Sequence, residues 1–342
     1  MHFNYFLGWD VSKATLDYCV LDRQGQAVDR GNIANEVPTI RKFFKRLCTQ
    51  LGAAACNILQ CVENTGVYTH PLLLVMHRAT DEAAPFLWRE DALQIKLSSG
   101  RQKDKTDAGD ALTIARYALR HQNDARAYTL PAKQLRQVRQ LLQLRRSLLK
   151  GLTALEVSYR ELKAYALYPL DTTGARIIRR QVQQMKKNLA ELDARLTALI
   201  QEDEQMRRLY RITQSVPGMG PKNSLVVLAL TELYQKIPTA RACASYAGIS
   251  PHTYQSGSSV RRGPRTSKAS SAELKTAIHL GAMSLIKHDN LYRQLYDRLR
   301  AKGKAHLSAI NAVRNKMLRV LYACIEKDTL YQKERHVSLH TP

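Results

Sequence analysis

The 342-residue sequence predicts an α/β domain at the N-terminus, a helical linker and a mainly α C-terminal domain. Short β-like runs alternate with helical segments over residues 1–125. Between positions 133 and 199, leucines recur at spacings of three and four, the period of long helices. After Ala272 the spacing is again helical, to about Glu326.

Strand-like runs dominate the start of the chain. Three come first, at residues 5–9, 15–22 and 27–33, with a turn at 22–25. Helical spacing over 38–51, a fourth strand over 57–62, a helix over 67–78 and a fifth strand over 84–88 follow. Thr106 is placed to cap a last helix that runs to Leu119. Three strands, helix, strand, helix, strand and helix is the order of ribonuclease H-like folds.

Carboxylates lie at two predicted strand ends and on the last helix. Asp10 follows the first strand and Glu63 ends the fourth, and these strands are neighbours in a ribonuclease H-like fold. Asp107 and Asp110 are three residues apart on the helix, so they share a face. Four converging acids require cations, and their oxygen ligands suit Mg²⁺ or Mn²⁺. Two such ions roughly 3.5–4 Å apart can activate a nucleophile at a phosphodiester.

Each acid also has a simpler interpretation. Asp10 could be a strand-end turn residue, Glu63 a solvated strand end, and the helical pair could stabilise the helix through its dipole. Asp104 is assigned to a loop pair with a neighbouring lysine, and Asp17 to an exposed strand position. The coincidence of the four acids at these places favours a metal site.

The charge balance indicates the class of partner. Lysine and arginine number 53 against 29 acidic residues, giving a net charge of +24 that attracts nucleic acid, although an architectural binder could be as basic. The six cysteines form no CxxC pair and lie beside no histidine cluster, so a zinc site is not expected. We expect a cytosolic or nucleoid-associated protein, because neither a signal-peptide core nor a membrane-spanning run is present.

Two long helices are predicted in the middle of the chain, with a break from Tyr168 through Gly174. The first covers 133–163, and the second has a strict heptad seam. The seam consists of Ile178, Val182, Met185, Leu189, Leu192, Leu196 and Leu199. The pair forms either an antiparallel hairpin or a dimerising coiled coil. The seam favours self-association, and a bundle within one domain is the alternative.

Residues 215–222 are a first candidate for nucleic-acid contact in the C-terminal third. A Pro-Gly-Met-Gly turn there precedes an apolar helix over 224–233. The turn resembles a helix-hairpin-helix turn, whose backbone amides can contact a phosphate backbone. This nominates Gly218, Gly220 and Lys222, although such turns also join helices that bind no ligand.

Residues 254–268 are the second candidate, because small hydroxyl residues and Gly257 precede a basic run. Glycine lets the backbone approach a ligand, and the basic side chains can hold a phosphate. These side chains are Arg261, Arg262, Arg265 and Lys268. A serine hydroxyl here could attack the phosphate and form a protein–DNA ester, and Tyr254 is a competing nucleophile. On spacing alone, a basic loop without chemistry is the simpler interpretation.

Six motifs occur together in a specific order over nearly the whole chain. They are residues 8–13 (GWDVSK), 63–68 (ENTGVY), 105–111 (KTDAGDA), 216–220 (VPGMG), 246–251 (YAGISP) and 256–259 (SGSS). In this combination the sequence resembles the DEDD transposases of bacterial insertion sequences. That family includes the pilin-gene invertases and the bridge-RNA-guided recombinases.

The resemblance implies three domains and a composite site. The domains are a RuvC-like catalytic domain (1–125), a coiled-coil linker for dimerisation (126–210) and a C-terminal transposase domain (211–342). The metal-binding tetrad would be Asp10, Glu63, Asp107 and Asp110, holding Mg²⁺ or Mn²⁺. Ser256 would be the nucleophile that joins to DNA. A shift of one acid would bring in Asp104, but Asp110-Ala111 leads straight into the helix as the family pattern does.

The same resemblance implies partners and an activity. Members act as dimers and tetramers, the serine of one subunit can complete the acidic site of another, and a non-coding guide RNA pairs with donor and target DNA. We therefore expect an RNA-guided DNA recombinase. The alternatives are a RuvC-like nuclease that uses metal-activated water, and a nucleic-acid-binding protein without catalysis.

Overall fold

The computed structural model describes residues 2–64, 66–77, 85–98, 107–165, 171–256, 260–266 and 270–333, with the side chains of 107–108 and 251–269 left out. The chain forms two compact units, Met1–Leu130 and Pro131–Pro342. Predicted features at Arg78, Ala84, Asp104, Thr106, Tyr168, Gly257 and Lys268 lie outside the described residues. In the described part, no helix is long and apolar enough to cross a membrane.

A mixed five-stranded sheet organises the N-terminal unit, in the order β3-β2-β1-β4-β5. Its strands are β1 (Tyr5–Val11), β2 (Thr15–Leu21), β3 (Ala27–Ala34), β4 (Ile58–Glu63) and β5 (Phe86–Glu90). β1 pairs with β2 in the antiparallel sense and with β4 in the parallel sense. β5 is parallel to β4. The predicted strand order is therefore found, with β1 and β5 each two residues longer at their carboxyl ends than expected.

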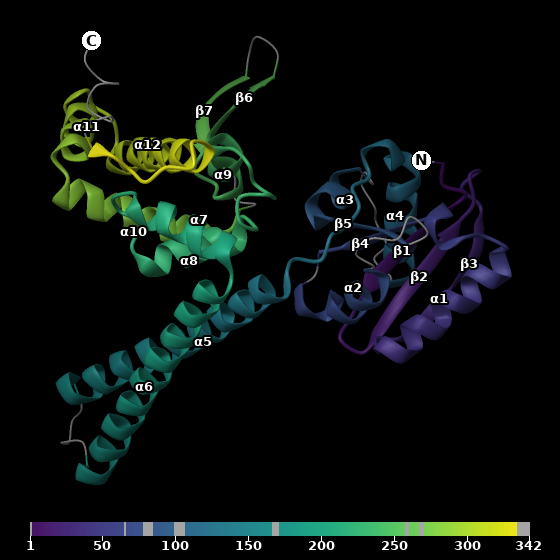
Figure 1. The fold of residues 1–342 in the computed structure, drawn as a ribbon, viewed down its shortest axis with the longest axis horizontal. Helices are drawn as coiled ribbons and strands as arrows, with labels where there is room; N and C mark the ends of the chain where they lie inside the picture. The colour runs from purple at the N-terminus through teal and green to yellow at the C-terminus, as the bar shows by residue number, and fades with distance from the viewer. Residues whose placement is uncertain are drawn as a thin grey trace. The chain divides into compact units, whose positions relative to one another are not determined.

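Alternating residues of the sheet pack against different helices. Trp9 and its neighbours on one face contact α1 (Val37–Leu51) and α2 (His70–Met76). Phe6 on the other face contacts α4 (Asp107–Arg120). Figure 1 shows these helices on opposite sides of the sheet. Because side chains alternate along a strand, this arrangement fixes which face each strand-end acid occupies.

The helix predicted over 67–78 is shorter and begins later. A 3-10 turn, η2 (Gly66–Thr69), precedes α2. Pro71 lies in the first turn of α2, where a missing backbone N–H costs no helical hydrogen bond. The described part of this unit also contains one short helix, α3 (Ala92–Ser98), and two further 3-10 turns, η1 (Ala55–Asn57) before β4 and η3 (Gln122–Asp124) after α4.

A long helical hairpin begins the second unit (Figure 1). It consists of α5 (Lys133–Tyr165) and α6 (Thr172–Glu202). Arg145 pairs with Asp193 and Glu156 with Lys186, so the two helices run antiparallel. Asp171 caps α6 by accepting from two backbone amides, and the helix therefore begins ahead of Gly174, where the sequence predicted a break.

Within its described residues, the second unit continues with six further helices and one hairpin of strands. The helices are α7 (Glu204–Ser215), α8 (Pro221–Leu230), α9 (Ala240–Tyr246), α10 (Ala272–His288), α11 (Asn290–Ala301) and α12 (His306–Glu326). The strands are β6 (Pro251–Ser256) and β7 (Val260–Thr266), which pair antiparallel. Apolar residues of α8, α10 and α12 form one buried core.

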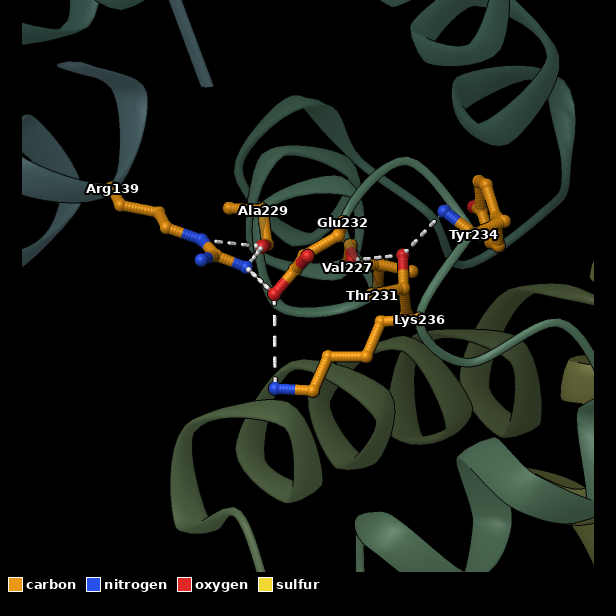
Figure 2. A network of polar contacts seen from close by, with 7 residues as sticks. All are labelled: Arg139, Val227, Ala229, Thr231, Glu232, Tyr234 and Lys236. Carbon is orange, nitrogen blue, oxygen red and sulfur yellow. Dashed lines mark hydrogen bonds and ion pairs between the residues drawn. The ribbon is translucent and has the colours of Figure 1, made fainter. Parts of the chain in front are cut away.

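The helix predicted over 224–233 ends earlier, at Leu230, because the chain turns left-handed. Glu232, Leu233 and Tyr234 have φ values of 51°, 56° and 65°, a conformation that costs non-glycine residues energy. Figure 2 shows the contacts that compensate. Arg139 of α5 donates from Nε and Nη2 to the Ala229 carbonyl at 2.8 and 2.6 Å, and its Nη2 lies 3.1 Å from Glu232. The Thr231 hydroxyl donates to the Val227 carbonyl and accepts from the Tyr234 amide.

Candidate functional site

Acidic residues form a row across four neighbouring strands of the sheet. Asp10 lies opposite Asp17 in the β1–β2 register, and Glu63 lies opposite Glu90 in the β4–β5 register. Trp9 pairs with Val62, so Asp10 and Glu63 are the next residues along two adjacent parallel strands. Neighbouring strands are about 4.8 Å apart. The register therefore brings together Asp10 and Glu63 as the sequence predicted.

The row occupies the face of the sheet that α4 covers. Asp10 is two residues from Gly8, and a Cβ on Gly8 would lie 2.3 Å from the backbone of both Ala111 and Ala115 of α4. Glycine is required at position 8 because the helix backbone rests on the strand. Asp110 precedes Ala111 directly and is half-buried, so the first turn of α4 begins beside the carboxyl end of β1. Asp107 is the first residue of α4, and its side chain lies outside the description.

Trp9 anchors the strand that carries Asp10. Its side chain is fully buried, and its indole nitrogen donates to Oε1 of the buried Gln60 on β4 at 3.0 Å. The Trp9 ring also makes an edge contact with Phe43 of α1. This polar link across the core holds β1 and β4 in one register, and thus Asp10 beside Glu63.

Glu90 was not among the predicted site residues. Its Oε2 accepts from the hydroxyl of Tyr117 on α4 at 3.3 Å, so its carboxylate faces the same helix as the rest of the row. Burial, and next the charge of Glu90, raise the pKa of Tyr117 to about 12. If the predicted fifth strand had been extended by two residues past Trp88, Glu90 would have been recognised as a strand-end acid beside Glu63. Asp17, which we expected at an exposed position, is half-buried opposite Asp10.

The donor set suits a hard divalent cation. All members of the row are carboxylates, the ligand type that Mg²⁺ and Mn²⁺ prefer. Like charges on neighbouring strands also disfavour one another unless a cation offsets them. Within the described residues, no three His, Cys, Asp or Glu side chains form a group that could hold one ion. The side chain of Asp107, one of the predicted ligands, lies outside the description.

The hairpin of β6 and β7 carries Ser256 and the candidate arginines. Ser256 ends β6 and pairs with Val260, and Arg261, Arg262 and Arg265 lie on β7. Their side chains are outside the description, as is all of Lys268.

Both ends of this hairpin are held by the helical core. On the entry side, the Ile249 carbonyl accepts from Asn311 Nδ2 at 2.6 Å and from Asn315 Nδ2 at 3.3 Å, both on α12. On the exit side, the Ser271 amide donates to the Tyr246 carbonyl at 2.9 Å. Neither asparagine was predicted, because only the folded chain brings α12 to residue 249.

The Gly218–Gly220 turn connects α7 with α8, as predicted, but its two glycines differ. Gly218 has a φ of 85°, and a Cβ there would lie 2.7 Å from the Gly281 carbonyl of α10. The positive φ and the close packing at position 218 are enough to require a glycine there. A bound ligand is not needed to explain this residue. A Cβ on Gly220 would meet nothing within 4 Å, so this residue remains open to a partner.

Lys222 makes an ion pair within the chain. Its Nζ lies 2.9 Å from Asp193 Oδ2, while Arg145 Nε bonds Asp193 Oδ1 at 2.7 Å. Burial raises the pKa of Asp193, but hydrogen bonds from Arg145 and Lys222 outweigh it and leave the pKa below its usual range. Lys222 therefore ties α8 to the helical hairpin, a role that the sequence prediction missed.

Two family models match the chain. A DEDD transposase model of the IS110 type matches residues 7–162, and the model "Transposase IS116/IS110/IS902 family" matches residues 210–297. The chain belongs to the IS110 family of transposases. These proteins are transposases and recombinases of insertion sequences, which agrees with the predicted family.

Named relatives of this transposase cover it to different extents. It is 23% identical to the pilin gene-inverting protein of Moraxella bovis over 97% of this chain and 98% of that protein. It is 33% identical to the IS110 uncharacterized 43.6 kDa protein of Streptomyces coelicolor, over 41% of this chain and only 34% of that protein. A second pilin gene-inverting protein, from Moraxella lacunata, is 23% identical over 68% of this chain and 70% of that protein.

Proposed function

We propose that this transposase is an RNA-guided DNA recombinase of an insertion sequence, which cleaves and exchanges strands through a serine–DNA intermediate at a Mg²⁺-dependent site. The observation that carries this proposal is the sheet register, which puts Asp10 beside Glu63 on the face covered by α4. A RuvC-like assignment for this unit is supported by its strand order and by the parallel pairing of β1 with β4.

Four carboxylates would hold the metal: Asp10, Glu63, Asp107 and Asp110. When bound, Mg²⁺ supplies positive charge that offsets the phosphate and favours ionisation of a nearby hydroxyl. The carboxylates of the row exclude a DNA phosphate in the absence of cations, because like charges repel. Glu90 and Tyr117 would shape the edge of this site without being ligands.

Ser256 would attack the DNA phosphate. Its oxygen gains a bond to phosphorus, a deoxyribose oxygen leaves, and the serine proton passes in net to that leaving oxygen. Because one phosphate ester replaces another, the exchanged DNA strand can be rejoined by the reverse reaction. We propose that Arg261, Arg262, Arg265 and Lys268 position the strand, with Gly218, Gly220 and Lys222 as further contacts.

The composite site implies an oligomer, with Ser256 of one subunit meeting the acids of another in a dimer or a DNA-bound tetramer. Half-exposed seam residues at the distal end of α6, such as Ile178 and Val182, favour self-association through the helical hairpin. A non-coding guide RNA would pair with donor and target DNA, and the net charge of +24 supports binding of both nucleic acids.

Two substitutions separate this reaction from its alternatives. Ser256→Ala and Asp10→Ala should each abolish strand exchange in a reaction with guide RNA, donor and target DNA, while binding of both nucleic acids persists. A nuclease that uses water would still cut with Ser256→Ala, and a binding protein would respond to neither change. Ser258→Ala and Asp124→Ala are matched controls, since Asp124 is an 82% exposed side chain of the same unit.

The covalent step has its own test. Labelled DNA is incubated with wild-type protein and Mg²⁺, quenched, and run on a denaturing gel. A protein–DNA adduct that depends on Ser256 is expected. Recombination without any such adduct would exclude the serine ester, and recombination that persists when the guide RNA is omitted would exclude RNA guidance.

A further inference from the structure

Asn35 joins the two segments that follow the acid-bearing strands β1 and β4. It comes directly after β3, at the same edge of the sheet as Asp10 and Glu63. Its side-chain amide donates from Nδ2 to the Ser12 carbonyl at 3.0 Å and to the Tyr68 carbonyl at 2.9 Å. Ser12 is two residues past Asp10, and Tyr68 is five residues past Glu63. One nitrogen atom therefore bridges the segments on both sides of the acidic row.

The bridge lies beyond the point where the pairing of β1 with β4 ends. The register between these strands runs to Trp9 and Val62, one residue before each acid. Backbone past the last pair of a ladder opens more easily than the ladder itself. Asn35 joins the two chains again past the acids. Asp10 and Glu63 therefore lie between the ladder on one side and this bridge on the other.

Each carbonyl that Asn35 contacts belongs to a turn with hydrogen bonds of its own. In the turn between β1 and β2, the Ser12 amide donates to the Thr15 carbonyl at 3.0 Å, and the Thr15 amide donates to the Ser12 hydroxyl at 3.0 Å. In η2, the buried Thr69 hydroxyl donates to the Gly66 carbonyl at 2.7 Å. Because these bonds hold each turn in shape, the bridge fixes the distance between the two turns.

The amide oxygen of Asn35 shows that the nitrogen determines how the side chain is oriented. Both neighbours of Nδ2 are carbonyls, which only accept hydrogen bonds, so the amide cannot be turned round. Oδ1 is left buried, without a hydrogen-bond partner among the described residues. An unpaired buried acceptor destabilises a fold and offsets what the two hydrogen bonds contribute. Stability alone therefore does not account for an asparagine at this position.

We propose that Asn35 is a positioning residue for the divalent cation, because it joins the turns after Asp10 and Glu63 and so sets the separation of the two carboxylates. The inference rests on the proposed function, since it takes the acidic row to hold a metal ion. Groups that orient metal ligands without touching the ion typically contribute about 10–100-fold to affinity. Asn35 acts through the backbone, so we expect an effect of about tenfold, at the low end of that range.

Binding of Mn²⁺ to the full-length protein, without nucleic acid, tests the proposal. Electron paramagnetic resonance measures free Mn²⁺ during a titration, and Asp10→Ala gives the binding that remains without the site. Asn35→Ala should raise the dissociation constant about tenfold. Its urea midpoint by tryptophan fluorescence should stay close to that of wild type, because loss of the unpaired oxygen offsets loss of the two hydrogen bonds.

Asn32→Ala is the matched control for this titration. Asn32 is an exposed residue of β3, and its side chain makes none of the hydrogen bonds described for this edge of the sheet. The variant should bind Mn²⁺ with the affinity of the wild-type protein.

A second pair of variants separates position from charge. Asn35→Asp keeps the size of the side chain but turns a carboxylate toward the two carbonyls, so the bridge is lost while a negative charge is added near the cation. Asn32→Asp adds the same charge opposite Asp17 in the β2–β3 register and leaves the bridge intact. Asn32→Asp should bind Mn²⁺ at least as tightly as wild type, and Asn35→Asp about tenfold more weakly. This pair also decides the matter if Asn35→Ala does not fold.

The outcomes separate the bridge from the metal site. Wild-type affinity in Asn35→Ala, whatever its urea midpoint, overturns the positioning role and leaves the proposed function intact. Tighter binding in Asn35→Asp, or equal losses in Asn35→Ala and Asn32→Ala, does the same. Equal Mn²⁺ binding by wild type and Asp10→Ala overturns the metal site itself, and the positioning role with it.

Discussion

The two units hold their candidate catalytic residues in opposite ways. Asp10 and Glu63 are on central strands, where buried Trp9 and Gln60 link β1 to β4. Ser256 is on a two-stranded hairpin whose described anchors to the helical core are at its ends, at Ile249 and Ser271. Under the proposed function, metal ligands must be fixed before the ion binds, and the paired central strands of the sheet supply this property. The same proposal requires the serine to meet the acids of another subunit, and we propose that a hairpin anchored at its two ends allows this.

Gly8→Ala should have the largest effect, and it should be confined to the N-terminal unit. The added Cβ would overlap the backbone of α4 at 2.3 Å, so α4 must move off the strand. We expect a loss of about 3 kcal/mol or more in unfolding free energy. Both tryptophans, Trp9 and Trp88, lie in this unit, so urea unfolding followed by tryptophan fluorescence measures it separately.

Gly174→Ala is the matched control, because a Cβ on Gly174 of α6 meets nothing within 4 Å. It should stabilise the helical hairpin by about 0.5–1 kcal/mol and leave the tryptophan transition unchanged. Wild-type-like stability of Gly8→Ala would contradict the packing of α4 on β1.

Arg139→Gln should produce the next largest effect, in the second unit. It removes two donors from the Ala229 carbonyl and the ion pair that holds the left-handed turn at Glu232. The unfolding free energy should fall by about 1–3 kcal/mol. Denaturant unfolding followed by far-ultraviolet circular dichroism measures it. Arg146→Gln is the control, since its 3.6 Å pair with Glu273 is half-exposed and contributes at most about 0.5 kcal/mol. Equal losses of unfolding free energy in the two variants would contradict the conclusion that Arg139 stabilises the left-handed turn at Glu232.

Asp193→Asn should destabilise the second unit by about 1 kcal/mol at neutral pH. The pKa of Asp193 is lowered from 3.8 in the folded chain, so its contribution is present above that value and is lost as pH falls through the folded pKa. Thermal midpoints of wild type and variant should therefore differ at pH 7 and converge below pH 4. A difference that is constant with pH would exclude an electrostatic role.

Glu90→Gln should have the smallest effect, a spectroscopic one. Burial and the charge of Glu90 raise the pKa of Tyr117 to about 12, so the tyrosinate forms only at very high pH. Removing the charge should lower that pKa, which ultraviolet absorbance at alkaline pH detects by difference from Tyr117→Phe. No shift would mean that Glu90 and Tyr117 are not in contact in solution.

The sheet could be predicted because its signals are local. Alternating runs and turns mark each strand, and strand order then brings Asp10 to Glu63. Glu90 was missed because the fifth run was ended at Trp88, two residues too soon. Whether Asp107, Asp110 and Ser256 complete a site stays a prediction, since the side chains of Asp107 and Ser256 lie outside the description.

The second unit resisted prediction where distant residues determine local conformation. Glu232, Leu233 and Tyr234 are not residues that favour positive φ, and the arginine that bonds the preceding turn lies 90 residues earlier than Ala229. Likewise, the sequence around Lys222 predicts a phosphate ligand, whereas in the structure Lys222 pairs with Asp193 on another helix. Such contacts leave no periodic signal in the chain.

The anchoring of Ile249 by α12 has a consequence for protein synthesis. The Asn311 amide that holds the Ile249 carbonyl is made 62 residues later. A nascent chain, or one cut short before α12, carries the serine-bearing strands without their support. The ribosome must therefore add at least 62 residues beyond Ile249 before this contact can form, and a product that stops before α12 lacks it.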